Sequence, residues 1–232
     1  MDRHDLLRPL AAPFSRGWFA LQRASQPVPQ PRDAPEAFAP GPNPDRVLIF
    51  GSGPAAGWGV LTHEIALPGS LARALTRRTG RGTRVELVAD MRITVRSALP
   101  IVRAIDTSRF DAIVVVLGAH YLFKLMPLSA WRKRLSAVLR TLDEKTSGQS
   151  RTFVAGVPPV ESLPGFDSRL GRMVAAHAFR MNQVTFELCE SSNARYVPLL
   201  AVEPADALRV RDGMTYRQWA DTIADAIAPE LD

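Results

Sequence analysis

The residues most able to do chemistry lie in a glycine-rich stretch that follows a short apolar run. Four glycines fall within the nine residues 51–59, and Ser52 stands between the first two of them. Glycine allows sharp turns and a close approach of backbone to ligand, and a serine hydroxyl can act as a nucleophile beside a base. The stretch therefore predicts a ligand site.

Histidine is the usual base for such a nucleophile, and the chain contains four histidines, His4, His63, His120 and His177. His120 follows the strongly apolar run 113–117, at the end of a predicted strand where ligand sites form, so we expect it to face a pocket. His63 is predicted to be a structural histidine satisfied by backbone groups. His177 falls in a helical pattern, where packing or surface exposure is expected.

The elements that position these residues alternate between short β-rich runs and helical runs, which is typical of a parallel sheet with helical crossovers. Predicted strands are 47–50, 84–88, 112–117, 152–155 and 196–199, and predicted helices are 69–79, 95–105, 128–146, 170–189 and 216–227. We therefore expect an α/β fold, a three-layer α/β/α sandwich of flavodoxin-like type with a five-stranded parallel sheet. Ligands should bind beyond the carboxyl ends of the strands.

Residues 1–45 have a different composition from the rest of the chain. An amphipathic start with Phe14, Trp18, Phe19 and Leu21 precedes a proline-rich stretch from 26 to 44, which cannot sustain a helix or a central strand. We predict an N-terminal arm and linker over 1–45 and one domain over 46–232. Docking of the arm on the domain is the simplest expectation, and a homo-oligomer formed through the arm and contact with a membrane surface are the alternatives.

Composition excludes several classes of protein. Hydrophobic residues form 46% and charged residues 22% of the 232 residues, which fits an ordinary globular chain. The net charge of +6 comes from scattered arginines without interleaved aromatics, so nucleic acid is not an expected partner. The single cysteine, Cys189, is predicted to be a buried structural thiol, and no metal or cofactor is implied. The apolar stretch near the N-terminus is interrupted by prolines, so we expect no membrane segment and a cytoplasmic location.

Four blocks of the sequence, in order along the chain, resemble the SGNH/GDSL hydrolases, in particular members from actinobacteria. The blocks are the strand and glycine-rich loop 47–60, residues 63–82, the stretch Gly118-Ala119-His120-Tyr121, and residues 216–220 close behind Asp212. The resemblance covers the chain from about Arg46 onward. It implies an esterase-type scaffold in which a serine, a histidine and an aspartate form the catalytic triad.

The resemblance also shows departures at the catalytic positions. Gly53 stands where the family carries its nucleophilic serine, and Ser52 occupies the aspartate position before it. Asp212 matches the aspartate that orients the base, but Thr215 stands where the histidine is expected. His120 replaces the asparagine that helps to bind the oxyanion in the family, and it can still donate a hydrogen bond.

The remaining predicted binding residues surround these positions. Gly51 belongs to the first block and Gly118 to the third. The family has a further oxyanion-binding glycine in another block, which has no secure counterpart in this sequence, and we expect Arg92 to occupy that space. Together with Gly53 and Thr215 they are expected to line a pocket for a small-molecule ester or acyl ligand.

Three functions stay open from the sequence. The favoured one is a degenerate member, a pseudoenzyme that keeps the fold and a ligand pocket. The second is an active esterase or acyltransferase with a rearranged site that uses Ser52 and His120. The third is a nucleotide-binding protein, because Gly51, Gly53 and Ala56 have the G-x-G-x-x-A spacing. Residues 58–67 separate that pattern from the next predicted helix, which weakens the third alternative.

Overall fold

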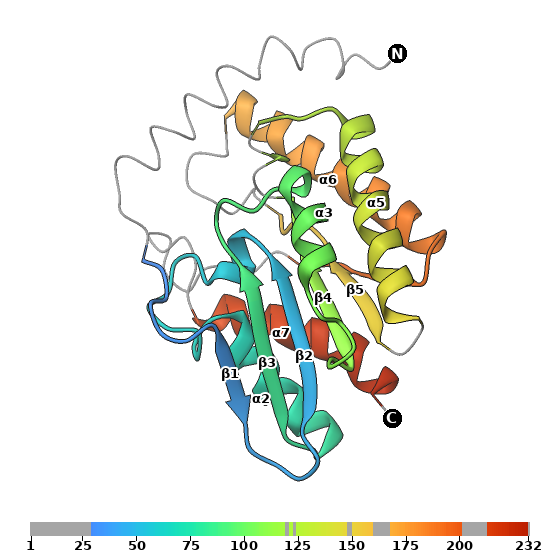
Figure 1. Ribbon diagram of the computed structural model, residues 1–232. Coiled ribbons are helices and arrows are strands. Elements are labelled where there is room, and N and C mark those ends of the chain that lie inside the picture. Colours follow the sequence, from blue (N-terminus) through green and yellow to red (C-terminus); the bar gives the residue numbers. More distant parts are fainter. Residues whose placement is uncertain are drawn as a thin grey trace.

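A six-stranded sheet forms the centre of the computed structural model, which describes residues 29–118, 121–122, 124–147, 150–159, 168–200 and 213–231. The strand order is β1-β3-β2-β4-β5-β6 (Figure 1). The strands are β1 (Glu36–Ala39), β2 (Asp45–Gly51), β3 (Thr83–Ala89), β4 (Ala112–Val116), β5 (Arg151–Ala155) and β6 (Ala194–Val197).

Five α-helices connect or follow the strands. They are α2 (Leu67–Thr79), α3 (Val95–Ala104), α5 (Leu128–Thr146), α6 (Arg169–Glu190) and α7 (Gly213–Ile227). Every predicted helix and every predicted strand corresponds to one of these elements, with ends that differ by at most three residues. No helix in the described ranges is long and apolar enough to span a membrane.

The expected sheet of five parallel strands was wrong in one respect, because the sheet is mixed and has a sixth strand. β1 pairs antiparallel with β3, with Glu36 opposite Glu86. This strand lies within the predicted arm and linker, between Pro35 and Pro40. Proline is tolerated at a sheet edge because one side of an edge strand needs no ladder hydrogen bonds. Four residues flanked by prolines carried too weak a pattern for the sequence to reveal it.

Helices cover both faces of the sheet, as a three-layer sandwich requires (Figure 1). The core with α3, α5 and α6 contains Leu48 and Phe50 of β2, whereas the core with α2 and α7 contains Val47 and Ile49 of the same strand. Side chains alternate between the faces because the strand is pleated. All five residues of β4 are buried, as expected of a strand that is covered by helices on both faces of the sheet.

The five parallel strands are in the doubly wound order β3-β2-β4-β5-β6. From β2 the chain crosses to β3 on one side, and β4 then joins on the other side. This reversal creates a topological switch point at the carboxyl ends of β2 and β4, which is where ligands bind in open α/β sheets.

Candidate functional site

Three loops converge at this switch point. Gly51, the last residue of β2, is opposite Ala89 of β3 and Val116 of β4. Beyond the strands, the amide of Ser52 donates to the carbonyl of Val116 at 2.9 Å, and the amide of Asp90 donates to the carbonyl of Gly51 at 3.1 Å. The loops that follow β2, β3 and β4 are therefore held side by side, as the sequence predicted.

Gly51 is needed for this close approach. Its φ of 145° is a conformation that favours glycine, and a Cβ atom at this position would lie 1.9 Å from the carbonyl oxygen of Val116. Gly118 has a similar role after β4, since its Cβ would lie 2.5 Å from Cγ2 of Val157. These two predicted binding residues thus set the distance between the loops.

The backbone around Ser52 decides what the serine can do. Ser52 is extended, with φ −150° and ψ 176°, is only 4% exposed, and precedes a short 3-10 helix, η1 (Gly53–Ala56). Its amide already donates a hydrogen bond to the carbonyl of Val116. Gly53 follows with φ 62°, and its amide is the first of the 3-10 helix, a position that has no acceptor within the helix itself. Of these two neighbouring amides, the one used in the contact between β2 and β4 therefore belongs to Ser52.

The two other predicted catalytic residues, His120 and Asp212, lie outside the described residues, and their roles stay predictions. Thr215 is in the first turn of α7 and is buried. The hydroxyl of the next residue, Tyr216, donates to the carbonyl of Trp58 at 2.7 Å. The start of α7 is therefore held against the loop that leaves the glycine-rich stretch.

Arg92 has its guanidinium on the surface of the loop after β3, with its side chain 91% exposed. Its Nε and Nη2 donate to the two carboxylate oxygens of Asp90 at 3.0 and 2.8 Å. These hydrogen bonds lower the pKa of the Asp90 carboxyl to about 2. The predicted role of Arg92 in ligand binding stays a prediction, and its charge is already paired with Asp90.

His63 contacts a carboxylate that the sequence did not associate with it. Its amide donates to both oxygens of Asp33, at 3.1 and 2.9 Å, and its Nδ1 lies 2.9 Å from Oδ1 of Asp33. The contact supports the predicted structural role of His63. Asp33 was missed because it lies 30 residues earlier, in the proline-rich stretch.

Two other reactive residue types lie on the buried side of α6. His177 is fully buried, so packing rather than surface exposure describes it. Cys189 is 3% exposed, and burial raises the pKa of its thiol to about 12. The prediction that this thiol is buried is confirmed. Among the described residues, no group of three or more His, Cys, Asp or Glu side chains could hold a metal ion.

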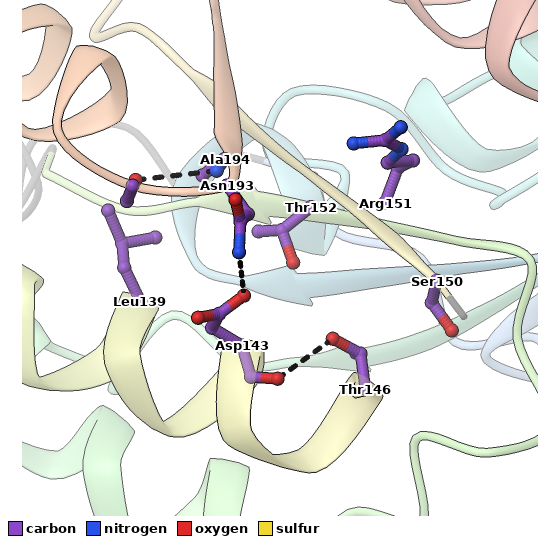
Figure 2. Close-up of a pocket in the computed structure, with 9 residues that line it drawn as sticks. Leu139, Asp143, Thr146, Ser150, Arg151, Thr152, Asn193 and Ala194 are labelled. Atoms are coloured by element: carbon purple, nitrogen blue, oxygen red, sulfur yellow. Dashed lines mark hydrogen bonds between the residues drawn. The ribbon is translucent and has the colours of Figure 1, made fainter. Parts of the chain in front are cut away.

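A polar pocket of about 290 Å³ opens at the opposite edge of the sheet, near the amino end of β5 (Figure 2). Nδ2 of Asn193 donates to Oδ1 of Asp143 at 2.6 Å across this pocket, and the hydroxyl of Thr146 donates to the carbonyl of Asp143 at 3.3 Å. Sequence reasoning did not predict this pocket. Several of its polar groups already have protein partners, whereas the topological switch point lies at the carboxyl ends of β2 and β4, so we place the candidate site there.

Comparisons with known proteins bear on the fold. The sequence matches no protein-family model and no curated protein. The native aryl esterase of M. smegmatis is similar at 15% sequence identity and a TM-score of 0.62, over 81% of this chain and 100% of that one. Est24, a carbohydrate acetylesterase from Sinorhizobium meliloti, is similar at 14% identity and a TM-score of 0.60, over 80% of this chain and 99% of that one. AlinE4, an SGNH-hydrolase family esterase, is similar at 19% identity and a TM-score of 0.53, over 66% of this chain and 75% of that one. Likeness at these identities concerns the fold, and the chain therefore has the fold of the SGNH hydrolases.

Proposed function

We propose that this chain is a degenerate SGNH hydrolase-like protein, which lacks the standard catalytic serine and histidine and binds a small ester or acyl ligand at the carboxyl edge of its sheet. The observation that carries the proposal is the backbone at Ser52 and Gly53. That backbone separates two features that a serine hydrolase of this type needs in one residue, a hydroxyl nucleophile and an amide directed at the oxyanion.

Ser52 has the hydroxyl, but its amide is bonded to Val116 and forms part of the contact between β2 and β4. Freeing that amide for an oxyanion would break the contact. Gly53 has the amide but no side chain. The amide of Gly53 can therefore still donate to a carbonyl or carboxylate oxygen, but Gly53 has no side chain that could act as a nucleophile.

The residue at the position of the catalytic base also supports the proposal of a degenerate hydrolase. Thr215 stands where the family resemblance requires a histidine, and a threonine hydroxyl does not accept a proton near neutral pH. Loss of a triad member typically lowers turnover by about four to six powers of ten, and loss of a second member adds little. Binding without efficient hydrolysis is the expected result.

The nature of the ligand is inferred from the scaffold. The similar structures are those of an aryl esterase, a carbohydrate acetylesterase and an SGNH-hydrolase family esterase. Because the loops that bind the acyl carbonyl in such a scaffold are the ones held together here at Gly51 and Val116, an ester or acyl compound is the class that we propose.

A fluorophosphonate probe tests the proposal directly. We expect no covalent adduct at Ser52 when the labelled protein is mapped by mass spectrometry, and turnover of 4-nitrophenyl acetate no faster than that of the Ser52→Ala variant. Ethyl butyrate should nevertheless give a saturable signal in saturation-transfer NMR. An adduct at Ser52 that disappears in His120→Ala would overturn the proposal in favour of the rearranged esterase or acyltransferase. Absence of ester binding would refute the ligand pocket.

Nucleotide binding is the remaining alternative from the sequence. A dinucleotide motif needs a helix that begins directly after the glycines, so that its N-terminus meets the pyrophosphate. Here η1 ends at Ala56, and α2 begins only at Leu67. A titration with NAD and NADP that shows saturable binding would reverse this preference. The cytoplasmic location and the homo-oligomer stay predictions from the sequence.

A further inference from the structure

The polar pocket at the amino end of β5 has the features of a second binding site. Its walls are the last turns of α5, the start of β5 and the segment that joins α6 to β6, and they include Leu139, Asp143, Thr146, Ser150, Thr152 and Asn193 (Figure 2). Its volume of about 290 Å³ is just below the range of about 300–1,000 Å³ for sites that hold drug-sized ligands, so it suits a smaller molecule. We call it the amino-edge pocket.

The hydroxyl of Thr152 faces the amino-edge pocket (Figure 2). Along β5, Val154 packs in the core with α3, α5 and α6, whereas Phe153 packs in the core with α2 and α7. Because side chains alternate along a strand, Thr152 shares the face of Val154, which is the face that α5 covers. Thr152 is only 7% exposed, and its hydroxyl forms no hydrogen bond with any described residue. A hydroxyl this buried normally has a partner, so its partner is expected inside the pocket.

Asp143 brings a negative charge to the same pocket. Its Oδ1 accepts Nδ2 of Asn193 at 2.6 Å, and its Oδ2 forms no hydrogen bond in the described part of the chain. No Lys or Arg side chain of the described residues forms an ion pair with it. The residue also lies in the last turn of α5, where the negative end of the helix dipole disfavours a carboxylate and favours a cation. A cation in the pocket would offset both effects.

The two basic residues next to the pocket in the sequence are engaged elsewhere. Nζ of Lys145 donates to the carbonyl of Arg103 at 3.0 Å. Arg151 precedes Thr152 and therefore points to the opposite face of the sheet, where its Nε lies 3.2 Å from Oε2 of Glu230. The carboxylate of Asp143 is thus left for a cation from outside the chain.

The other hydroxyls of the pocket can accept hydrogen bonds from a ligand but have already spent their hydrogens. The hydroxyl of Thr146 donates to the carbonyl of Asp143 at 3.3 Å, and that of Ser150 donates to the carbonyl of Phe110. A hydroxyl has one hydrogen and two lone pairs, so both oxygens keep the capacity to accept. With Oδ2 of Asp143 and the hydroxyl of Thr152, they make the pocket rich in acceptors. It therefore fits a ligand with several donors.

We propose that the amino-edge pocket binds a small primary alkylammonium ion, with its nitrogen between Asp143 and Thr152 and its alkyl chain against the buried Leu139. An ammonium group has three N–H donors and a positive charge, which match these acceptors. A guanidinium fits less well, because its paired donors suit both oxygens of a carboxylate and Asn193 already holds one of them. This site is separate from the ester site proposed at the carboxyl edge and does not depend on it.

Butylammonium chloride is the probe, added to the full-length protein at pH 7, where the amine is protonated. Saturation-transfer NMR on its alkyl protons measures binding at physiological salt, and 1-butanol is the uncharged control ligand. Asp143→Asn removes the charge but keeps an acceptor for Asn193, and Thr152→Val removes only the free hydroxyl. The matched control is Glu144→Gln, because Glu144 is exposed, lies outside the pocket lining and carries the same charge at the same helix end.

We expect saturable binding of butylammonium to the unaltered protein and none of 1-butanol. Affinity should fall at least about tenfold in Asp143→Asn, because a hydrogen bond to a charged group contributes more than the about 1.4 kcal/mol that tenfold requires. It should fall about threefold or more in Thr152→Val and stay unchanged in Glu144→Gln. The urea midpoint of each variant shows that it is folded.

Failure of butylammonium to bind the unaltered protein would overturn the proposal. Equal weakening in Asp143→Asn and Glu144→Gln would also overturn it, because the attraction would then belong to the helix end and not to the pocket. Tighter binding of butylguanidinium than of butylammonium would refute the choice of an ammonium ion. None of these outcomes alters the expectations for Ser52 and the ester ligand.

Discussion

Replacement of Gly51 by alanine is the sharpest test of how the loops converge. The new Cβ would lie 1.9 Å from the carbonyl oxygen and 2.7 Å from the carbonyl carbon of Val116, and these backbone atoms belong to the central strand β4. Neither rotation of a side chain nor a small shift relieves such a contact. β2 and β4 must separate at their carboxyl ends, and the hydrogen bond from Ser52 to Val116 must break.

The cost has two parts. The φ of 145° strains any residue with a Cβ, at about 1–3 kcal/mol. Loss of the bond between Ser52 and Val116 leaves a buried backbone group unpaired, at about 1–3 kcal/mol. We therefore expect Gly51→Ala to lower the free energy of unfolding by about 4 kcal/mol, which a domain of ordinary stability survives. Urea unfolding measures the change as a shift of midpoint at constant slope.

Gly80→Ala is the matched control. Gly80 has φ 69° as the residue that ends α2, but no atom lies within 4 Å of its Cβ position. Only the backbone strain remains, so the expected loss is about 1–2 kcal/mol. If Gly51→Ala proves no more destabilising than Gly80→Ala, the loops after β2 and β4 are not held together as described, and the placement of the candidate site is wrong.

Three further predictions concern other parts of the molecule. Cys189 should react with Ellman's reagent only as fast as the protein unfolds, because burial raises its pKa to about 12; rapid reaction of the folded protein would contradict this. Thr185→Val should cost about 2 kcal/mol in urea unfolding, because it leaves the buried Nε1 of Trp131, now 3.0 Å from the threonine hydroxyl, without its acceptor; a neutral effect would argue against that bond. Arg92→Ala should raise the pKa of Asp90 from about 2 toward 3.8, which NMR of the carboxyl carbon would follow. In the unaltered protein the ion pair should stabilise the fold above pH 3.8, and this stabilisation should be lost as pH falls through about 2. An unchanged titration of Asp90 in the variant would exclude the ion pair.

Much of the fold was decided by local sequence. The continuous apolar runs in β2 and β4 specify strands buried on both faces, because side chains point to opposite faces along a strand. Thr94 and Ser97 form a capping box at the start of α3, and Gly80 ends α2 in a left-handed conformation. Such signals act over a few residues, so the sequence alone was sufficient to locate the helices and the five parallel strands.

Tertiary structure decided what no local pattern could express. Strand β1 exists because β3 offers an unpaired edge, and its own sequence carries only a weak alternation. The contact of Asp33 with His63 joins residues 30 positions apart. Above all, the sequence showed that Ser52 and Gly53 depart from a catalytic pattern. Only the pairing of β2 with β4 showed that the amide of Ser52 is the one already hydrogen-bonded to the carbonyl of Val116. A hydrogen bond to Val116 depends on strand register, and register is a property of the assembled sheet.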